Sequence, residues 1–201
     1  MTSTSSIARE AQAAAAKITL DKADSRRTLL AARSAMPADA RRQYDAAIGA
    51  HVLAWWRTHP VQTLGIFWPM RGEQDLRDVY TELAAQGVQL ALPLVVARDA
   101  PLQFGAWAPG EPLEVDAMGV SIPAQIPAQS RIMLNPEVLL IPCVGFNAAR
   151  VRLGYGGGYY DRTLAVAPRP FAIGIAYANG LARFDAAPHD VALDLVITEA
   201  S

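Results

Sequence analysis

The sequence contains a single cysteine, Cys143, among its 201 residues. One cysteine excludes an internal disulfide and any zinc site built from several cysteines. Cys143 follows an expected buried strand and has no activating base near it in the sequence, so we expect a small core residue rather than a nucleophile. Low cysteine usage also suits a reducing compartment, and we expect a cytoplasmic protein.

Long apolar runs and an excess of one charge are also missing. Charged residues such as Arg9, Glu10 and Lys17 interrupt the N-terminal segment, so no signal-peptide core is visible. No stretch approaches the roughly 18 apolar residues of a membrane span. Eighteen basic and nineteen acidic side chains give a net charge of −1, which provides no overall field for nucleic acid or an anionic membrane. We expect neither as a partner.

The remaining composition, 52% hydrophobic and 18% charged, is that of an ordinary globular protein. The first residues are rich in Ser, Thr and then Ala, and we expect residues 1–16 to form a flexible tail. The rest of the chain has the length of one domain and contains no obvious linker. We therefore expect residues 17–201 to form a single α/β domain.

Segments with helical spacing alternate with short apolar runs. Proline and glycine punctuation predicts helices over residues 22–34, from Pro37 to about residue 58, and over 75–86. Apolar runs predict strands over 63–68, 88–92 (ending at Pro93), 102–107, 138–142, 171–176 and 193–198, with hairpins and loops in the proline-rich segment 98–135. The strand–helix–strand order of residues 63–92 indicates parallel strands. The expected fold is a three-layer α/β sandwich around a mostly parallel, Rossmann-like sheet.

The segment Arg152–Asp161, RLGYGGGYYD, is unusual because four of the five residues 154–158 are glycine. Glycines let backbone amides approach a ligand closely, and a helix beginning at Tyr159 would offer unpaired amides to an anion. Arg152 adds a guanidinium suited to phosphate. The segment follows a predicted strand, and open α/β sheets bind ligands at the carboxyl ends of their strands. These residues predict a nucleotide triphosphate site.

The segment matches neither common phosphate fingerprint. A P-loop requires a lysine after its last glycine, and the pattern G-x-G-x-x-G fails because the third glycine comes one residue early. From the residues alone, a structural glycine turn and a phosphate loop both stay open. Asp161 is either a solvent-facing carboxylate or a ligand of a Mg²⁺ that bridges phosphates. His189 and Asp190 are either an acid–base or metal pair, or a surface histidine beside a carboxylate.

At these residues the sequence resembles the 5-formyltetrahydrofolate cyclo-ligases, also called methenyltetrahydrofolate synthetases. The central match is LIPCVGFNAARVRLGYGGGYYDR, supported by PHDVALDLVITE near the C-terminus, FWPMRGEQD at 67–75 and KADSRR at 22–27. Together the matches cover roughly residues 20–199. The resemblance implies ATP- and Mg²⁺-dependent cyclisation of 5-formyltetrahydrofolate to 5,10-methenyltetrahydrofolate, through phosphorylation of the formyl oxygen and with release of ADP and phosphate.

The resemblance also implies roles for individual residues. Arg152 and Tyr159 would be catalytic, and Asp161 and Asp190 would hold Mg²⁺. The ATP-binding residues would be Lys22, Arg26, Arg152, Leu153, Gly154, Tyr155, Gly156, Gly157, Gly158, Tyr159 and Tyr160. The folate-binding residues would be Trp68, Glu73, Tyr155, Gly156, Gly157, Gly158 and Tyr159, with Glu73 accepting hydrogen bonds from the pterin.

Several of these residues have plainer alternatives. Trp68 can be a core tryptophan, and Glu73 can be an acidic residue favoured before the next helix. Lys22 and Arg26 lie four residues apart on one helical face, which also describes a solvated stripe.

The sequence also departs from the family pattern at the entry to the glycine loop. Asn147 stands where the family usually has Asp, and Arg150 stands where Gly is common. The loop entry can therefore be shaped differently in this chain, and an extra cation lies close to the expected phosphate site.

Three functions remain after these observations. They are the cyclo-ligase itself, a paralogue without folate activity that serves, for example, a thiamin-related pathway, and a non-catalytic nucleotide-binding module. The joint presence of Glu73, Asp161 and Asp190 favours the enzyme, because a binding module needs no pterin carboxylate. We expect a monomer or a weak dimer that acts on 5-formyltetrahydrofolate and ATP.

Overall fold

The computed structural model describes residues 21–116, 119–124 and 132–201, so the expected tail, residues 1–16, lies outside the described residues. Seven strands form the main sheet, and their bounds are β1 Thr63–Gly65, β2 Gln89–Leu94, β3 Gln103–Trp107, β6 Met133–Leu134, β7 Val138–Pro142, β10 Phe171–Ile175 and β11 Leu195–Ile197. Their order is β11-β10-β7-β1-β2-β3-β6. The five strands from β11 to β2 are parallel, and β3 and β6 are antiparallel to their neighbours. The expected α/β fold with a mostly parallel sheet is confirmed.

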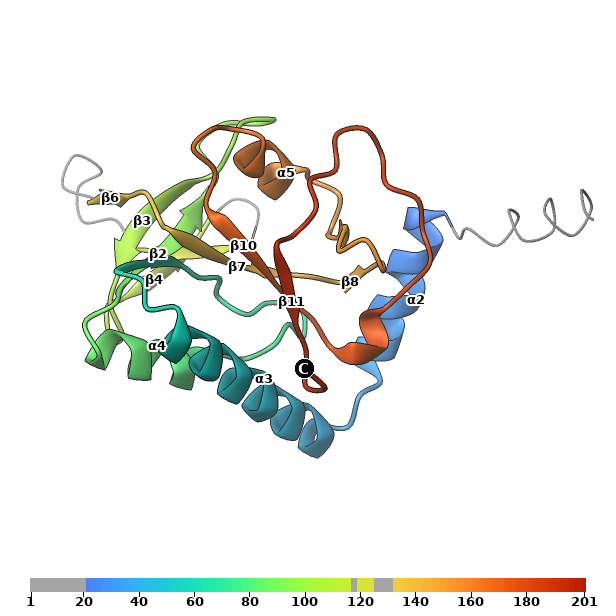
Figure 1. Cartoon of the computed structure of the whole chain (residues 1–201), viewed down its shortest axis with the longest axis horizontal. Helices are drawn as coiled ribbons and strands as arrows, with labels where there is room; N and C mark the ends of the chain where they lie inside the picture. Colours follow the sequence, from blue (N-terminus) through green and yellow to red (C-terminus); the bar gives the residue numbers. More distant parts are fainter. Residues whose placement is uncertain (1–20, 117–118, 125–131) are drawn as a thin grey trace, which may run out of the picture.

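Helices cover the sheet and flank the carboxyl end of β7 (Figure 1). Their bounds are α2 Lys22–Ser34, α3 Ala38–Thr58, α4 Arg77–Ala85, α5 Tyr159–Leu164 and the 3₁₀ turn η2 Ala178–Gly180. Figure 1 shows α3 and α4 along one side of the sheet and α5 on the other, with α2 beside the end of β7. Within the described part of the chain, no helix combines the length and apolar character that crossing a membrane requires.

Strand β7 is buried on both faces, which is why its sequence is a continuous apolar run. Val138 and Leu140 belong to the core under α3 and α4, together with Ile48 and Tyr80. Leu139 and Ile141 belong to the second core, together with residues of α5. The sheet therefore has a helical layer on each side, as the sequence predicts.

Two short antiparallel pairs lie outside the main sheet. One joins β4 (Leu113–Val115) to β5 (Ser121–Pro123) within the proline-rich segment, where hairpins were expected. The other joins β8 (Gly145–Phe146) to β9 (Arg152–Leu153) and was not predicted, because each of its strands has only two residues. This second pair holds the entry to the glycine loop.

Several predicted strand boundaries are wrong by one to three residues, and two of them have a clear physical cause. The strand expected over 63–68 pairs only as far as Gly65, although Ile66 still donates its N–H to the Ala91 carbonyl at 2.8 Å. Strand β2 does not end at Pro93 but continues to Leu94. The backbone groups of odd-numbered residues in β2 face β1. Pro93 faces the same way but lies beyond the last residue of β1, so the strand loses no ladder hydrogen bond by having proline there.

Gly145 on β8 lies against the backbone of η2. A Cβ at this position would stand 2.6 Å from the Gly180 carbonyl oxygen and 2.4 Å from a Leu29 methyl carbon. We predict that Gly145→Ala lowers the free energy of unfolding by about 1–3 kcal/mol, because backbone must move to admit the methyl group. Urea denaturation at one pH measures the change.

Gly154→Ala is the matched control, because its added Cβ would meet no described residue within 4 Å other than its two chain neighbours. This control should change stability by no more than about 0.5 kcal/mol. Equal stability of Gly145→Ala and the wild type would contradict the close approach of β8 and η2.

Candidate active site

The candidate site lies beyond the carboxyl ends of the parallel strands, where open α/β sheets bind ligands. Four segments meet there: helix α2, the loop after β1, the β8–β9 pair with the glycine loop, and the segment that precedes β11. Long-range side-chain contacts tie these segments together. They involve most of the charged residues that the sequence singles out.

The glycine loop is connected to α2 through Arg26. Its Nε donates to the Gly154 carbonyl at 2.6 Å, and its guanidinium lies near the position that a Cβ on Gly156 would occupy. Gly156 and Gly158 have φ values of 99° and 66°, conformations that other residues adopt only with strain. Glycine is therefore favoured by the backbone path at positions 156 and 158, whatever the loop binds. Arg26 is not a purely solvated residue.

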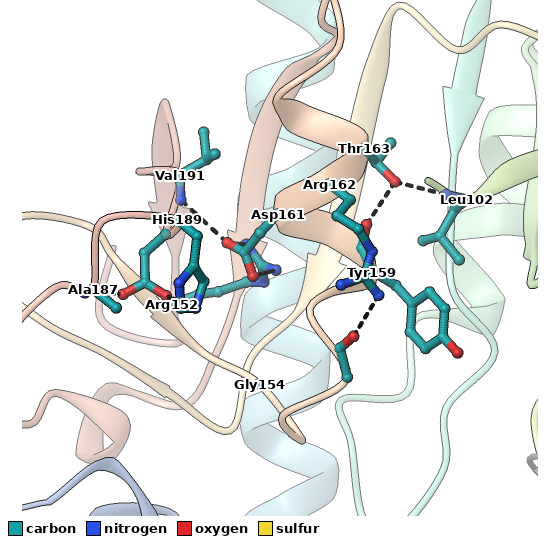
Figure 2. A network of polar contacts seen from close by, with 12 residues as sticks. Leu102, Arg152, Gly154, Tyr159, Asp161, Arg162, Thr163, Ala187, His189 and Val191 are labelled. Atoms are coloured by element: carbon teal, nitrogen blue, oxygen red, sulfur yellow. Dashed lines mark hydrogen bonds and ion pairs between the residues drawn. The ribbon is translucent and has the colours of Figure 1, made fainter. Parts of the chain in front are cut away.

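Arg152 and Asp161 form a two-point ion pair across the glycine loop. Arg152 Nη1 and Nη2 donate to Asp161 Oδ1 and Oδ2 at 3.0 and 2.7 Å. Figure 2 shows Asp161 also accepting the N–H of Val191, at 3.2 Å. Arg152 is buried, and its guanidinium lies 5.6 Å from the centre of the Tyr160 ring. The first and last residues of the segment 152–161 are thus joined directly.

Lys22 and Asp190 form the second ion pair of the site. The Asp190 carboxylate also accepts the N–H of Ala187 at 2.6 Å. Burial disfavours the charged carboxylate, but the hydrogen bonds from Lys22 and Ala187 outweigh it and hold the pKa of Asp190 below its usual range. His189 is exposed, with its Nε2 3.9 Å from Asp190 Oδ1.

The two predicted metal carboxylates approach each other through the backbone, since Val191 follows Asp190 and binds Asp161. Among the residues that the structure describes, no group of three or more acidic, histidine or cysteine side chains could hold a metal. Two carboxylates still fit Mg²⁺, because this ion is usually held by one or two carboxylates together with substrate phosphates. The donor set suits an ion that arrives with a nucleotide.

Glu73 is buried in the loop after β1. Its Oε2 accepts the N–H of Met70 at 3.0 Å, and its carboxylate is hydrogen-bonded to the Tyr155 side chain. Arg71 and Gly72 between them have φ values of 50° and 73°, so this turn includes one non-glycine residue in a strained conformation. Glu73 and Tyr155, predicted from separate motifs, are thus brought together.

Burial raises the pKa of Glu73 to about 7, against the opposing effects of the Met70 N–H and of the Arg33 and Arg71 charges. The same surroundings, burial first and then the Glu73 charge, raise the pKa of Tyr155 to about 12. The Tyr155 hydroxyl therefore keeps its proton at neutral pH and donates a hydrogen bond to the Glu73 carboxylate.

Trp68 is half-buried and contributes to the wall of a cavity. Its ring packs edge-on against Trp107, with 5.4 Å between the ring centres, and Arg77 lies over it at 5.6 Å. Trp68 and Glu73 both line a cavity of about 1060 Å³ between α3, residues 68–73 and the start of α4. A core position alone does not describe this tryptophan.

Tyr159 lies apart from the ion pairs. Figure 2 shows its ring directed away from Asp161, and the Arg162 guanidinium lies 4.9 Å from the ring centre. Thr163 Oγ1 donates to the Tyr159 carbonyl at 2.8 Å and accepts the Leu102 N–H at 2.9 Å. The Tyr159 side chain therefore points away from the Asp161 side of α5, where Arg152 binds. Its catalytic role stays a prediction.

The departures at the loop entry are accommodated by hydrogen bonds within the turn and to the segments around Phe184 and Leu193. Asn147 Oδ1 accepts the N–H groups of Ala149 and Val151 at 3.0 and 2.9 Å, as an aspartate would. Its Nδ2 additionally donates to the Phe184 carbonyl at 3.1 Å. Arg150 has a φ of 59°, the region that favours glycine, and its Nε donates to the Leu193 carbonyl. The extra cation thus holds the loop entry rather than facing the glycine run.

Arg33 was not singled out from the sequence. It is buried in the last turn of α2, donates from Nη2 to the Cys143 carbonyl, and lies 3.4 Å from the Tyr155 hydroxyl oxygen. Its position, seven residues after Arg26 and eleven after Lys22, puts all three on one helical face, and that spacing was the available signal. Cys143 itself is buried and burial raises its pKa to about 12, which confirms it as a core residue.

The fold and this site define an α/β protein that carries a glycine-rich loop, flanked by cations, at the carboxyl edge of a parallel sheet. Residues 18–199 match the model of the 5-formyltetrahydrofolate cyclo-ligase family. The chain belongs to this family.

Known relatives agree with the assignment. A 5-formyltetrahydrofolate cyclo-ligase of Mycoplasma pneumoniae is 30% identical over 90% of this chain and 99% of its own. The structure of a 5,10-methenyltetrahydrofolate synthetase from the same organism superposes with a TM-score of 0.70 at 29% identity, covering 90% of this chain and 99% of that one. An Aquifex aeolicus 5,10-methenyltetrahydrofolate synthetase, with a TM-score of 0.75 at 24% identity over 90% of each chain, shares the fold.

The raised pKa of Glu73 predicts a pH-dependent contribution to stability. Its carboxyl has a usual pKa of 4.5 and a pKa of about 7 in the folded protein, so the folded state holds the proton more tightly. Stability from this group is complete below pH 4.5 and is lost as the pH rises to about 7. At pH 8 we expect Glu73→Gln to have a free energy of unfolding higher than that of the wild type by on the order of 3 kcal/mol, as measured by urea denaturation. At pH 5 this difference should be smaller.

Glu82→Gln is the control, because Glu82 is a partly exposed carboxylate on α4. Its stability difference from the wild type should be the same at both pH values. A Glu73→Gln difference that does not change between pH 5 and pH 8 would refute the raised pKa.

Proposed function

We propose that this protein catalyses the ATP-dependent closure of 5-formyltetrahydrofolate to 5,10-methenyltetrahydrofolate, with release of ADP and phosphate. The main support for this reaction is that the chain belongs to the cyclo-ligase family. The convergence of Lys22, Arg26, Arg152 and Glu73 from separate segments at one edge of the sheet supports this chain's own ability to perform it. A non-catalytic module would have no use for a buried carboxylate beside a phosphate loop.

In the proposed reaction the formyl oxygen attacks the γ-phosphorus of ATP, and ADP leaves. N10 of the folate then attacks the activated formyl carbon and loses its proton, and the released phosphate carries away the former formyl oxygen and takes up that proton as the second ring C–N bond is completed. The protein's contribution is to orient the two substrates and to neutralise the charge on the transferring group.

The cations around the glycine loop are suited to the nucleotide. We assign the phosphates to the loop 152–160 and to Lys22 and Arg26, because these residues come from two elements already in contact through Gly154. Arg152 provides a buried guanidinium at the loop entry, held at a fixed angle by Asp161. A pre-oriented cation loses little freedom when charge develops next to it.

Asp161 and Asp190 are the carboxylates that would hold Mg²⁺ together with the phosphates. When bound, the ion neutralises phosphate charge and favours in-line transfer. In this chain the two carboxylates also hold Arg152 and Lys22, so each aspartate serves both to position a cation and to bind the metal.

The folate is assigned to the other half of the site, around Glu73, Trp68 and Tyr155. A carboxylate can accept two parallel hydrogen bonds from the pterin N–H and amino group. The Tyr155 hydroxyl and the Met70 N–H fix the Glu73 side chain for that purpose. Glu73 then binds the pterin best in its ionised form, so folate binding should weaken as the pH falls below about 7.

The activity is tested by mixing the purified protein with 5-formyltetrahydrofolate, Mg²⁺ and ATP and following the absorbance of methenyltetrahydrofolate. We expect product only when ATP is present, and ADP in equal amount, because each ring closure consumes one phosphoryl transfer. ADP formed without methenyltetrahydrofolate, or no ATP-dependent absorbance at all, would reject the proposed reaction and leave the paralogue or the binding module.

The metal assignment predicts a changed requirement for Mg²⁺. We expect Asp161→Asn and Asp190→Asn to raise the Mg²⁺ concentration for half-maximal rate by about tenfold or more. Removing even a residue that only hydrogen-bonds to a metal ligand typically costs about tenfold or more in metal affinity. Asp99→Asn is the control, because Asp99 is a largely exposed carboxylate near Arg162. Circular dichroism checks that each variant is folded. A Mg²⁺ dependence equal to that of the wild type in a folded Asp161→Asn would rule out Asp161 as a ligand.

A further inference from the structure

We propose that Arg33 is the positioning residue of the folate half of the site: its buried guanidinium holds Tyr155, and its stem holds the turn before Glu73, in the arrangement that accepts the pterin. This inference rests on the proposed function for its catalytic consequence. Its physical content, the contact of Arg33 with Tyr155 and with the turn that precedes Glu73, stands on the geometry alone. Arg33 does not touch the folate in this assignment, so it is not a catalytic residue.

The first observation is the depth at which Arg33 lies. Only 4% of its surface is exposed. Such burial is rare for an arginine unless its charged group has partners. Its Nη2 donates to the Cys143 carbonyl at the end of β7, and its Nη1 lies within hydrogen-bond distance of the Tyr155 hydroxyl. The guanidinium thus fastens helix α2 to a central strand and to the glycine loop at once.

The second observation is that, within the part of the chain that the structure describes, no carboxylate lies within ion-pair distance of Arg33. Among the described residues, its hydrogen-bond partners are a carbonyl and a hydroxyl. A Cβ on Gly72, the residue before Glu73, would lie 3.7 Å from Arg33 Cγ and Cδ, so the Arg33 stem packs against the Glu73 turn. The Arg33 charge lowers the pKa of Glu73, as does the hydrogen bond from Tyr155. A chain of donors runs from Arg33 to Tyr155 to Glu73, and each donor orients the next.

Other groups around Glu73 do not replace this charge. Arg71 is a second cation nearby, but it is exposed and screened by water. Tyr155, Tyr160, Tyr80 and Cys143 also face Glu73 from the glycine loop, α5, α4 and the end of β7.

Burial raises the pKa of all four of these groups, so they stay neutral where Glu73 titrates. Of the two cations whose charges lower the pKa of Glu73, Arg33 and Arg71, Arg33 is therefore the buried one. The Met70 N–H helps it from the backbone.

The consequence concerns the pH at which the enzyme binds folate. Loss of the Arg33 charge removes an interaction that favours ionised Glu73, so the pKa of Glu73 moves upward. An upward move of about one pH unit would reduce the ionised fraction at pH 7.5 from about three quarters to about one quarter. The KM for 5-formyltetrahydrofolate would then rise about threefold at that pH, and less at pH 9.

The test compares Arg33→Gln, Arg33→Lys and the wild type. The titration of the Glu73 carboxyl carbon is followed by ¹³C NMR and assigned by its absence in Glu73→Gln. We expect Arg33→Gln to move this titration upward by about one pH unit, and Arg33→Lys to move it by less than half as much, because lysine keeps the charge. Arg27→Gln on the exposed side of α2 is the matched control and should leave it unchanged.

Steady-state kinetics on the same proteins then measure the catalytic consequence. In Arg33→Gln the KM for folate should rise with a pH profile displaced in the same direction, and the KM for ATP should stay within about twofold of the wild type. Arg33→Lys should restore the profile but not the full affinity, because an ammonium group cannot donate in the fork geometry of a guanidinium.

Each outcome separates the two proposals. An unmoved Glu73 titration in folded Arg33→Gln overturns the inference, even if activity falls, because a merely structural role would lower stability without moving that titration. If Arg33→Gln does not fold, Arg33→Lys decides: a Glu73 titration displaced by a full pH unit despite the retained charge overturns the inference. A wild type without turnover would reject the proposed function, while the NMR titration would still report on Arg33 and Glu73.

Discussion

The ion pair between Arg152 and Asp161 is the interaction on which the site depends. It joins Arg152, two residues before the first glycine of the run, to Asp161 in the first turn of α5, so the backbone between them has fixed ends. A buried ion pair is weak support for stability, because desolvation offsets much of its Coulomb energy. Its value here is geometric: five residues that include four glycines cannot hold a shape alone, and the two-point contact restricts the paths open to them.

Helix α2 supplies the second constraint, since it contacts the other segments of the site from one face. Lys22 reaches Asp190, Arg26 reaches Gly154, and Arg33 reaches Cys143 and Tyr155. The N-terminal and C-terminal thirds of the chain are joined through these contacts. The helix therefore does for the whole site what the ion pair does for the loop, and its cations are used for assembly as well as for binding phosphate.

Much of this arrangement could be predicted from the sequence, and the exceptions have physical causes. The apolar run of β7 predicts a strand, and the spacing of apolar residues in α2 and α4 predicts helices, because burial dictates both patterns. Strand β1 was predicted too long, since Ile66 and Phe67 are as apolar as strand residues but lie in a buried loop. Arg33 escaped notice because an arginine is usually exposed, and only the fold reveals that this one lies beneath Tyr155.

The distribution of charge divides the site into two halves with different chemistry. Asp161 and Asp190 each meet a cation directly, and the pKa of Asp190 lies below its usual range, so that carboxylate is ionised at any physiological pH. Glu73 forms no ion pair with any other described residue, and burial raises its pKa to about 7 against the opposing charge of Arg33. Permanent charges thus surround the loop assigned to phosphate, and the tunable carboxylate lies where the pterin is assigned. The same protein interior that makes Glu73 costly to ionise also strengthens every hydrogen bond that the ionised form can accept.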